Sequence, residues 1–257
     1  MRTVAVTAGM QWWYPEAARR FTERFNRLAS YRDDGFECVN ANELLKGQWS
    51  RIKDHRFIKS YLWDVLPEDI DRILWLDCDM FQSRPIGLSD LPDVPWAAVR
   101  DTKWTDEKTR EEYAWAQNEV IQFFNGGVFL AKRETRDIFE FVKGISEQII
   151  AGEMKTHHTG DQKWFNLAVA RKYKDFANNY SGWLDMGNEW NVIKGRDRPR
   201  QPIFTHFAGV HDRWTIMELM YNAADEVERF LLRQQGVKPD PDVGPGAVGN
   251  GKGVEVG

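Results

Sequence analysis

Two aspartates separated by one position close the apolar run RILWL, which has the pattern of a buried strand. Successive side chains of a strand point to opposite faces, so Asp77 and Asp79 are expected on one side and Cys78 on the other. Carboxylates this close repel each other unless positive charge lies beside them. The pattern therefore predicts either basic side chains or a bound divalent cation next to the pair. The structural alternative is a strand end capped by solvated acids near Arg72 and Arg84.

The stretch FFNGGVFL holds a second polar feature, because Asn125, Gly126 and Gly127 stand between apolar runs. Asn-Gly in this setting is a strong hairpin signal, so a tight turn accounts for it without any ligand. Glycines also let the backbone approach a bound molecule closely. Both interpretations stay open from these residues alone.

The stretch TGDQKWFN combines helix-start chemistry with polar side chains suited to a site. Thr159 and Gln162 fit the S/T-x-x-E/Q capping box, and Asp161 suits the positive N-terminal end of a helix. His206, in the later stretch THFAG, is by itself best interpreted as a structural histidine. Neither stretch defines a site without its context.

The composition limits the class of protein. The 257 residues are 42% hydrophobic, which suits one large α/β domain or two small ones. Lys+Arg 35 against Asp+Glu 39 leaves a net charge of -4, so no basic field predicts a nucleic-acid partner. No stretch approaches the ~18 apolar residues of a transmembrane segment. The two cysteines, Cys38 and Cys78, form at most one disulfide, so a reduced, cytoplasmic setting is expected.

Strand-like and helix-like segments alternate along the chain, as in α/β folds. The expected strands cover 3–7, 36–40, 72–79, 95–101, a strand or hairpin within 120–132, and 202–209. Helical stripes of apolar residues cover 17–28, 57–66, 138–149 and 216–230. From Gly236 the chain is rich in Gly, Pro and Asp and holds no aromatic residue, so it cannot offset its ordering entropy by burial. These patterns predict a domain at 1–235 and a flexible tail at 236–257.

The order of the segments carries more information than any one of them. A strand ending VTAG is followed by HRFIKSYLWDVLPEDIDRILWLDCDM, AAVRD, FFNGGVFLA, DQKWFN, EWNVI and THFAG. This succession resembles the GT-A glycosyltransferases, specifically the glycogenin-like family of retaining galactosyl- and glucosyltransferases, over residues 3–215. The resemblance implies a single α/β domain of GT-A, Rossmann-like fold, with a central, mostly parallel twisted sheet flanked by helices. In such sheets ligands bind at the C-terminal ends of the strands.

The resemblance also implies a metal site. In that family the D-x-D pair and a late histidine bind Mn²⁺, which bridges the diphosphate of a nucleotide-sugar, and the matching residues here are Asp77, Asp79 and His206. A divalent cation neutralises the charge that grows on the departing nucleoside diphosphate, and mixed oxygen and nitrogen ligands suit Mn²⁺ or Mg²⁺.

Metal-dependent transfer of a hexose, with retention, is the activity that the resemblance implies. The family's residues beside the transferred sugar match Asp161 and Gln162, which are therefore the implied catalytic pair. The implied donor-binding residues are Thr7, Ala8, Tyr14, Arg56, Asp77, Cys78, Asn125, Gly126, Gly127, Gly209, His211 and Arg213. The acceptor, which is a glycan, a lipid or a protein, depends on variable loops and stays open.

Two departures from the family pattern concern the donor. The family usually has a lysine in a Gly-x-x-Lys-Pro-Trp stretch, but this chain has GVHDRW, with Asp212 in its place and His211 and Arg213 as the neighbouring basic residues. The first strand ends VTAGMQWWY, without the acidic residue that commonly recognises uracil, so Trp12, Trp13 or Tyr14 is expected to stack on the base. A UDP-sugar is nevertheless the favoured donor.

Two alternatives remain from the sequence. Haloacid-dehalogenase-like phosphatases also place D-x-D at a strand end, with the first aspartate as nucleophile, but usually near the start of the chain and followed by Thr or Val. Here the motif begins at Asp77 and Met80 and Phe81 follow it. The other alternative is a binding protein of GT-A fold that has lost catalysis, which the missing lysine favours and the three metal ligands disfavour.

Overall fold

The computed structural model describes residues 1–9, 14–48, 52, 54–101, 119–120, 122–154, 160–175, 178, 180–194, 201–208 and 212–234. The chain divides into two units, Met1–Met217 and Glu218–Gly257. The helix α7 (Arg213–Gln234) begins in the first unit and ends in the second. The tail predicted at 236–257 lies outside the described residues, so its flexibility stays a prediction.

A six-stranded sheet forms the frame of the first unit. Its strands are β1 (Arg2–Thr7), β2 (Cys38–Asn40), β3 (Ile70–Leu76), β5 (Trp96–Arg100), β6 (Phe124–Lys132) and β7 (Leu184–Asp185), in the order β2-β1-β3-β6-β5-β7. The pairs of β1 with β2, β1 with β3 and β5 with β7 are parallel, and β6 runs antiparallel to both of its neighbours. The predicted mostly parallel α/β sheet is confirmed.

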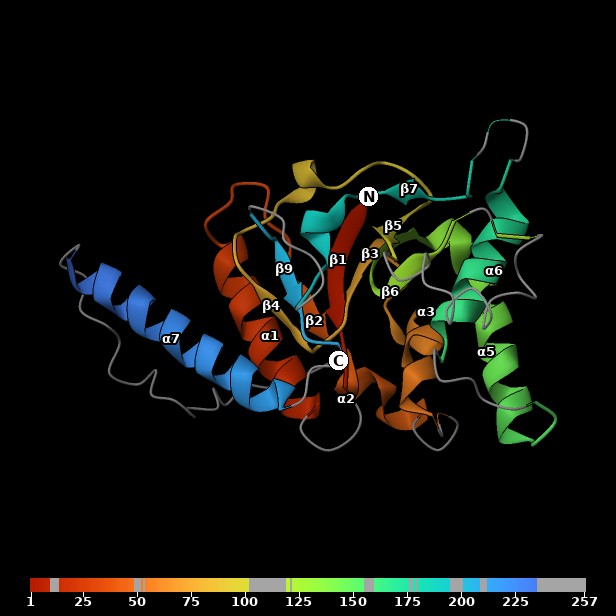
Figure 1. Ribbon diagram of the computed structural model, residues 1–257, viewed down its shortest axis with the longest axis horizontal. Helices are drawn as coiled ribbons and strands as arrows, with labels where there is room; N and C mark the ends of the chain where they lie inside the picture. The colour runs from red at the N-terminus through yellow and green to blue at the C-terminus, as the bar shows by residue number, and fades with distance from the viewer. Residues whose placement is uncertain are drawn as a thin grey trace, which may run out of the picture. The chain divides into compact units, whose positions relative to one another are not determined.

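Helices cover both faces of this sheet (Figure 1). The helix α1 (Tyr14–Ala29) packs Phe21 and Phe25 against the face that carries Leu74 and Leu76 of β3. On the other face, Ile73 and Trp75 of β3 pack in the same core as side chains of α3 (Leu62–Val65), α5 (Arg136–Ile150) and α6 (Gln162–Tyr173). Because β3 is buried on both faces, its sequence is a continuous apolar run rather than an alternating one.

A second, three-stranded sheet of order β4-β9-β8 lies at the end of β3, and the expected strand at 202–209 belongs to it rather than to the main sheet. Its strands are β4 (Met80–Gln82), β8 (Val192–Ile193) and β9 (Phe204–His206). The two aspartates therefore stand in the connection between the sheets rather than inside a strand. The backbone N–H of Asp77 donates to Gly127 O at 2.9 Å, and Asp79 O accepts from Phe207 N at 3.0 Å. These bonds tie one aspartate to β6 and the other to the end of β9.

Three local expectations differ from the structure. The hairpin interpretation of Asn-Gly is wrong, because Asn125, Gly126 and Gly127 lie inside the continuous strand β6, where the pairing with β5 shifts register. The helical stripe at 57–66 is a 3₁₀ helix, η2 (His55–Tyr61), followed by one turn of α3. The capping-box interpretation fails because α6 has Asp161 at its N-cap and begins at Gln162, while Thr159 lies outside the described residues.

The remaining short elements complete the first unit. They are α2 (Asn42–Leu45), η1 (Lys46–Gln48), η3 (Leu88–Asp90), η6 (Arg133–Thr135) and η7 (Asn188–Trp190). No helix in the described part of the chain has both the length and the apolar character needed to cross a membrane.

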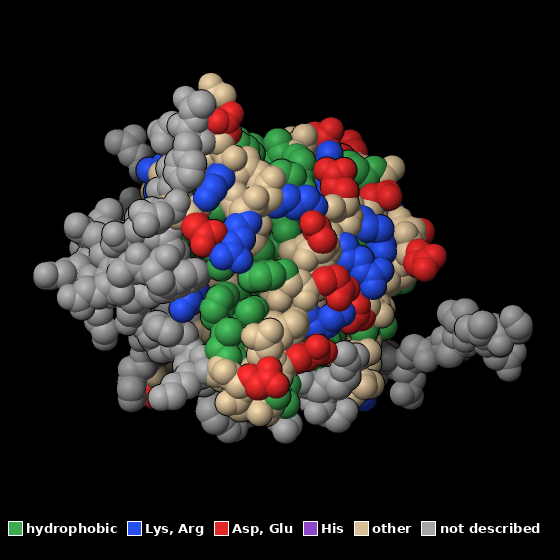
Figure 2. Space-filling view, turned by 90° about the vertical axis from the view of Figure 1, so that its right-hand side faces the viewer, with side chains coloured by type: hydrophobic (Ala, Val, Ile, Leu, Met, Phe, Trp, Pro, Cys, Tyr) green, Lys and Arg blue, Asp and Glu red, His purple; other side chains and the backbone are tan. Residues whose placement is uncertain are grey.

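The side of the molecule that carries α5 and α6 is mixed in charge. Figure 2 shows basic and acidic side chains interspersed on it. Lys143 pairs with Asp64 at 2.8 Å, and Lys172 pairs with Asp137 at 2.5 Å. On the described part of this face, basic side chains are thus offset by acidic neighbours.

Candidate active site

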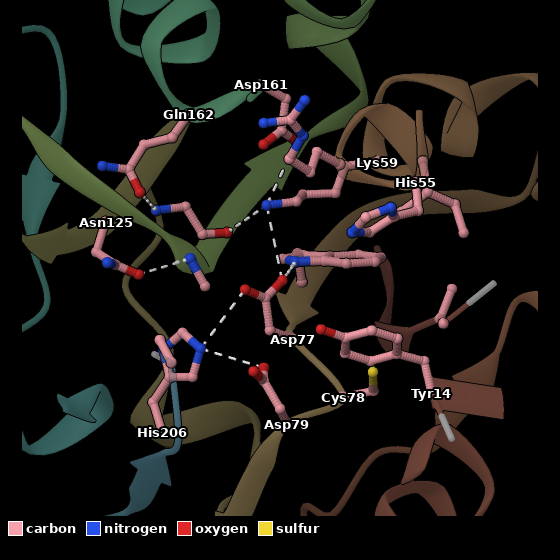
Figure 3. A pocket seen from close by; sticks show the side chains of 18 of the residues that line it. Tyr14, His55, Lys59, Asp77, Cys78, Asp79, Asn125, Asp161, Gln162 and His206 are labelled. Atoms are coloured by element: carbon pink, nitrogen blue, oxygen red, sulfur yellow. Dashed lines mark hydrogen bonds and ion pairs between the residues drawn. The ribbon is translucent and has the colours of Figure 1, made fainter. Parts of the chain in front are cut away.

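A pocket of about 360 Å³ opens where β1 and β3 end and β6 begins. Figure 3 shows polar side chains converging on it from η2, the connection after β3, β6, the start of α6, and β9. These segments are far apart in sequence, and the sheet order places their ends at one edge. The pocket has two walls. We call the side formed by Asp77, Asp79 and His206 the acidic wall, and the side formed by Lys59, Asp161, Gln162 and Gly126 the lysine wall.

The acidic wall brings together the three predicted metal ligands. One ligand atom from each of Asp77, Asp79 and His206 can be chosen so that all lie within 4.8 Å of one another. His206 Nε2 lies 3.2 Å from Asp79 Oδ1 and 3.8 Å from Asp77 Oδ2. Burial alone would lower the pKa of His206, but the two carboxylates outweigh it and raise that pKa. Two carboxylates and one imidazole, of which Asp79 and His206 are buried and Asp77 is partly exposed, converge on a donor set that fits Mn²⁺ or Mg²⁺.

A chain of amides stands behind His206. Its Nδ1 lies 3.0 Å from Asn191 Oδ1, and Asn191 Nδ2 donates to Asn125 Oδ1 at 2.8 Å. Asn125 Oδ1 also accepts from Gly127 N at 2.8 Å. A Cβ on Gly127 would lie 2.7 Å from His206 Cε1, so glycine is required for the ring to sit against β6.

Lys59 is the central residue of the lysine wall. Its Nζ donates to Gly126 O at 2.9 Å and lies 3.3 Å from Asp161 Oδ2 and 3.6 Å from Asp77 Oδ1. Burial opposes the charge, but Asp161 and Asp77 together raise the pKa of Lys59. The Trp75 ring lies 5.6 Å from the ammonium, and Trp75 Nε1 donates to Asp77 Oδ1 at 2.7 Å. A buried lysine thus links the two aspartates that the sequence placed in different motifs.

Asp161 and Gln162 meet the pocket at the first turn of α6. Asp161 is only 3% exposed, and burial raises its pKa to about 6 against the pull of Lys59. Its Oδ2 accepts no hydrogen bond within the described part of the chain, although it faces Lys59. Gln162 Oε1 accepts from Gly126 N at 2.9 Å, and its Nε2 donates to Asp101 Oδ2 at 2.8 Å. The amide is therefore fixed in one orientation, and the carboxylate is held by its ion pair with Lys59.

Arg213, Tyr14 and His55 stand at the remaining side of the pocket. Arg213 Nη1 donates to Asp79 Oδ2 at 3.2 Å, and its Nη2 bonds to the Tyr14 hydroxyl. The rings of Tyr14 and His55 are stacked with centroids 6.0 Å apart. Burial raises the pKa of Tyr14 to about 12, so its hydroxyl stays protonated at neutral pH. This side offers one cation beside an aromatic surface.

Most of the predicted site residues line this one pocket: Ala8, Tyr14, Arg56, Asp77, Cys78, Asp79, Asn125, Gly126, Gly127, Asp161, Gln162, His206 and Arg213. Thr7 is fully buried at the end of β1 and is not among the lining residues. Arg56 lines the pocket but its guanidinium pairs with Asp54 at 2.5 Å. The predictions for Gly209, His211, Trp12 and Trp13 lie outside the described residues.

Sequence reasoning missed Lys59, Asn191 and Asp101. Lys59 stands three positions after the predicted Arg56, and its pattern within an apolar stripe is that of an exposed helical lysine. Asn191 and Asp101 lie in the quoted stretches EWNVI and AAVRD, so their segments were recognised but not their roles. Only the three-dimensional contacts distinguish these residues from ordinary polar positions.

The architecture is that of a GT-A glycosyltransferase. A glycosyltransferase involved in glycosylation of the major capsid of PBCV-1 is 16% identical with a TM-score of 0.52, over 85% of this chain and 100% of that one. The bifunctional glycosyltransferase WbbM is 14% identical with a TM-score of 0.54, over 81% of this chain and 45% of that one. An active-site mutant of LgtC is 15% identical with a TM-score of 0.50, over 80% of this chain and 87% of that one. At these identities the likeness concerns the fold.

The sequence itself defines the family. The model of glycosyl transferase family 8 matches residues 11–217, and the chain belongs to that family. It is therefore a glycosyltransferase, and the phosphatase interpretation of the D-x-D motif is wrong. No curated protein sequence matches the chain.

Proposed function

We propose that the protein transfers a hexose from a nucleotide-sugar, with a UDP-sugar as the favoured donor, to a glycan, lipid or protein acceptor, with retention. The convergence of Asp77, Asp79 and His206 with Lys59 and Asp161 in one pocket carries this proposal. A cytoplasmic location, predicted from the two cysteines, stays part of the proposal; both cysteines are free and buried.

The acidic wall would hold Mn²⁺ or Mg²⁺ through Asp77, Asp79 and His206. Bound there, such a cation supplies charge neutralisation for the departing nucleoside diphosphate. Arg213 lies beside Asp79 with its guanidinium and occupies the region where the family's lysine is expected, so we assign it to the diphosphate. Tyr14 presents an aromatic ring for the nucleobase next to it.

The lysine wall would hold the sugar. Asp161 lines the pocket and its buried Oδ2 pairs with Lys59 Nζ at 3.3 Å, and we assign this carboxylate as an acceptor for a sugar hydroxyl. Gln162 stands next to it with its amide held by Gly126 and Asp101, which orients it toward the transferred group without adding charge. Gly126 and Gly127 belong to the donor site in this proposal, because their lack of a side chain lets Lys59 and His206 pack against the β6 backbone.

The donor and the reaction are tested with one screen. UDP-, GDP-, CMP- and dTDP-sugars are added to the protein with Mn²⁺ or with EDTA, and the melting temperature is recorded. A ligand that binds only the folded state stabilises it by about 2.7 kcal/mol at a concentration one hundred times its Kd. We expect stabilisation by UDP-sugars with Mn²⁺, slow release of free sugar, and loss of both in Asp77→Asn and His206→Ala.

The matched control is Asp33→Asn, because Asp33 is exposed and away from the pocket and the change removes the same charge. Binding without hydrolysis or transfer to any acceptor would favour the binding-protein alternative. Absence of stabilisation by every nucleotide-sugar would refute the donor assignment.

A further inference from the structure

The carboxylate of Asp79 is shared between the acidic wall and an arginine at the edge of the pocket. Its Oδ1 lies 3.2 Å from His206 Nε2, while its Oδ2 accepts a hydrogen bond from Arg213 Nη1 at 3.2 Å. The Asp79 side chain is only 10% exposed, so salt screens this ion pair less than one on the open surface. One oxygen of a predicted metal ligand is thus already compensated by a positive charge of the protein.

The guanidinium of Arg213 is held in this place by an aromatic neighbour and by the backbone. Its Nη2 bonds to the hydroxyl of Tyr14, and its Cζ lies 5.2 Å from the centroid of the Tyr14 ring. Arg213 is the first residue of α7, and Asp212 before it has a φ of 54°, a left-handed backbone that is uncommon outside glycine. The turn at Asp212 and the contacts with Tyr14 therefore keep a positive charge beside Asp79.

A positive charge at this place acts differently on two forms of a metal ligand complex. Arg213 repels a bare divalent cation, which also finds one oxygen of Asp79 already paired. A divalent cation bound to a nucleoside diphosphate has a net negative charge, because the diphosphate carries more charge than the cation, and a guanidinium binds phosphate oxygens well. The same residue opposes one form and favours the other, so it supplies a repulsive and an attractive element of specificity.

We propose that Arg213 is a specificity-determining residue that makes the acidic wall select the complex of a divalent cation with a diphosphate over the bare cation. This selectivity rests on the proposed function for the sites of the cation and the diphosphate, and it adds that Arg213 weakens binding of the cation alone. Removal of Arg213 should therefore change two affinities in opposite directions, whereas loss of a merely structural contact would weaken both.

Two titrations of the full chain test this selectivity. In the first, Mn²⁺ alone is added to the metal-free protein and the free ion is followed by electron paramagnetic resonance. In the second, UDP is added at saturating Mn²⁺ and binding is followed by calorimetry. Arg213→Met should bind Mn²⁺ alone about tenfold more tightly than the wild type, because a positive charge next to a ligand oxygen is lost. It should bind UDP with Mn²⁺ about 10- to 100-fold more weakly.

Three further variants show whether charge is the cause. Arg213→Gln keeps an amide donor near Asp79 and Tyr14 but is neutral, so it should show the same two changes, and it decides the test if Arg213→Met does not fold. Arg213→Lys keeps the charge, so its Kd for Mn²⁺ alone should stay near the wild-type value. The matched control Arg136→Met removes an arginine that pairs with Asp64 at 3.3 Å outside the pocket, and should leave both Kd values unchanged.

The outcomes separate this selectivity from the proposed function. Binding of Mn²⁺ alone that is equal or weaker in Arg213→Met, or absent from both proteins, would overturn the selectivity, while Mn²⁺-dependent UDP binding by the wild type would leave the proposed function intact. Binding of Mn²⁺ alone that is tighter in Arg213→Met, or detectable only there, would support the selectivity. A wild type in which Mn²⁺ does not promote UDP binding would refute the proposed function and the selectivity with it.

Discussion

The two walls of the pocket differ in how the charges of their aspartates are compensated. On the lysine wall, Lys59 lies between Asp161 and Asp77 and is itself held by a backbone carbonyl. On the acidic wall, Asp77 and Asp79 face the Nε2 of His206, and Arg213 pairs with one oxygen of Asp79. One wall is neutralised by the protein, whereas the other presents carboxylates and an imidazole that a cation would satisfy.

The different charges of the two walls indicate which part of a nucleotide-sugar each wall suits. Asp77, Asp79 and Asp161 supply three negative charges, and Lys59 and Arg213 supply two positive ones. A divalent cation would turn this deficit of one charge into an excess of one, which attracts an anionic diphosphate. A neutral sugar suits the side that is already compensated, since it adds hydrogen-bonding groups but no charge.

The largest expected effect comes from removing the cation of the lysine wall. Lys59→Met leaves Asp161 and Asp77 without their buried partner, and we expect a loss of about 3–5 kcal/mol in the free energy of unfolding, measured with urea. The control Lys172→Met removes a lysine that pairs with an exposed aspartate, and should cost less than about 1 kcal/mol.

A double variant tests whether the pair is the cause. In Lys59→Met with Asp161→Leu both partners become apolar, so part of the lost stability should return. A double variant as destabilised as the sum of its single variants would show that Lys59 acts through something other than Asp161.

The two walls were not equally predictable from sequence. Asp77 and Asp79 directly follow the apolar run of β3, where charged residues are conspicuous, whereas His206 lies in β9 and was predicted only through the family resemblance. Lys59 sits in the stripe of η2, where a lysine is expected to point to solvent, and nothing local indicates that it is buried. The main sheet was predictable from its apolar runs, but the short β4 and β8 were not, because strands of two or three residues depend on pairing rather than on pattern.

Titration of the Asp161 carboxyl should make the free energy of unfolding depend on pH. Its pKa is about 6 in the folded chain, above the unfolded value near 3.8, so it contributes stability that is fully present below about pH 4 and is lost as the pH rises through 6. The full shift corresponds to about 3 kcal/mol. The difference in unfolding free energy between the wild type and Asp161→Asn should therefore change by up to this amount between pH 4 and 7. A difference independent of pH would contradict the assignment.

Substitution of Arg213 tests whether the acidic wall binds the diphosphate of the donor. Its guanidinium contacts Asp79 and Tyr14 but is about a quarter exposed, at 26% of its side chain, so the fold depends on it little. Arg213→Met should weaken Mn²⁺-dependent UDP binding by about 10- to 100-fold, the value of a hydrogen bond to a charged group, with little change in stability. Arg213→Lys should recover part of this loss. Calorimetry decides, and equal UDP affinity in wild type and Arg213→Met would remove Arg213 from the donor site.

The smallest and sharpest comparison uses two adjacent glycines, one for each wall. Neither has a left-handed backbone, so alanine at either position is a steric change only. A Cβ at 127 would lie 2.7 Å from His206 Cε1 and 2.9 Å from Asn125 Oδ1, and the chain of amides behind His206 leaves the ring little room to move. A Cβ at 126 would lie 3.2 Å from Lys59 Nζ and 3.4 Å from Gln162 Cβ, where a flexible lysine end can yield.

Gly127→Ala should therefore raise the Kd for Mn²⁺ about tenfold, as expected when a ligand is displaced, because the imidazole must leave its place beside the carboxylates. Gly126→Ala should change that Kd less than about threefold, within the usual effect of a change that meets no rigid neighbour. Titration of both variants with Mn²⁺ alone makes the comparison direct. Equal Kd values would mean that the position of His206 against β6 does not matter for the cation, and the distinction between a cation-dependent wall and a self-neutralised wall would then lose its structural basis.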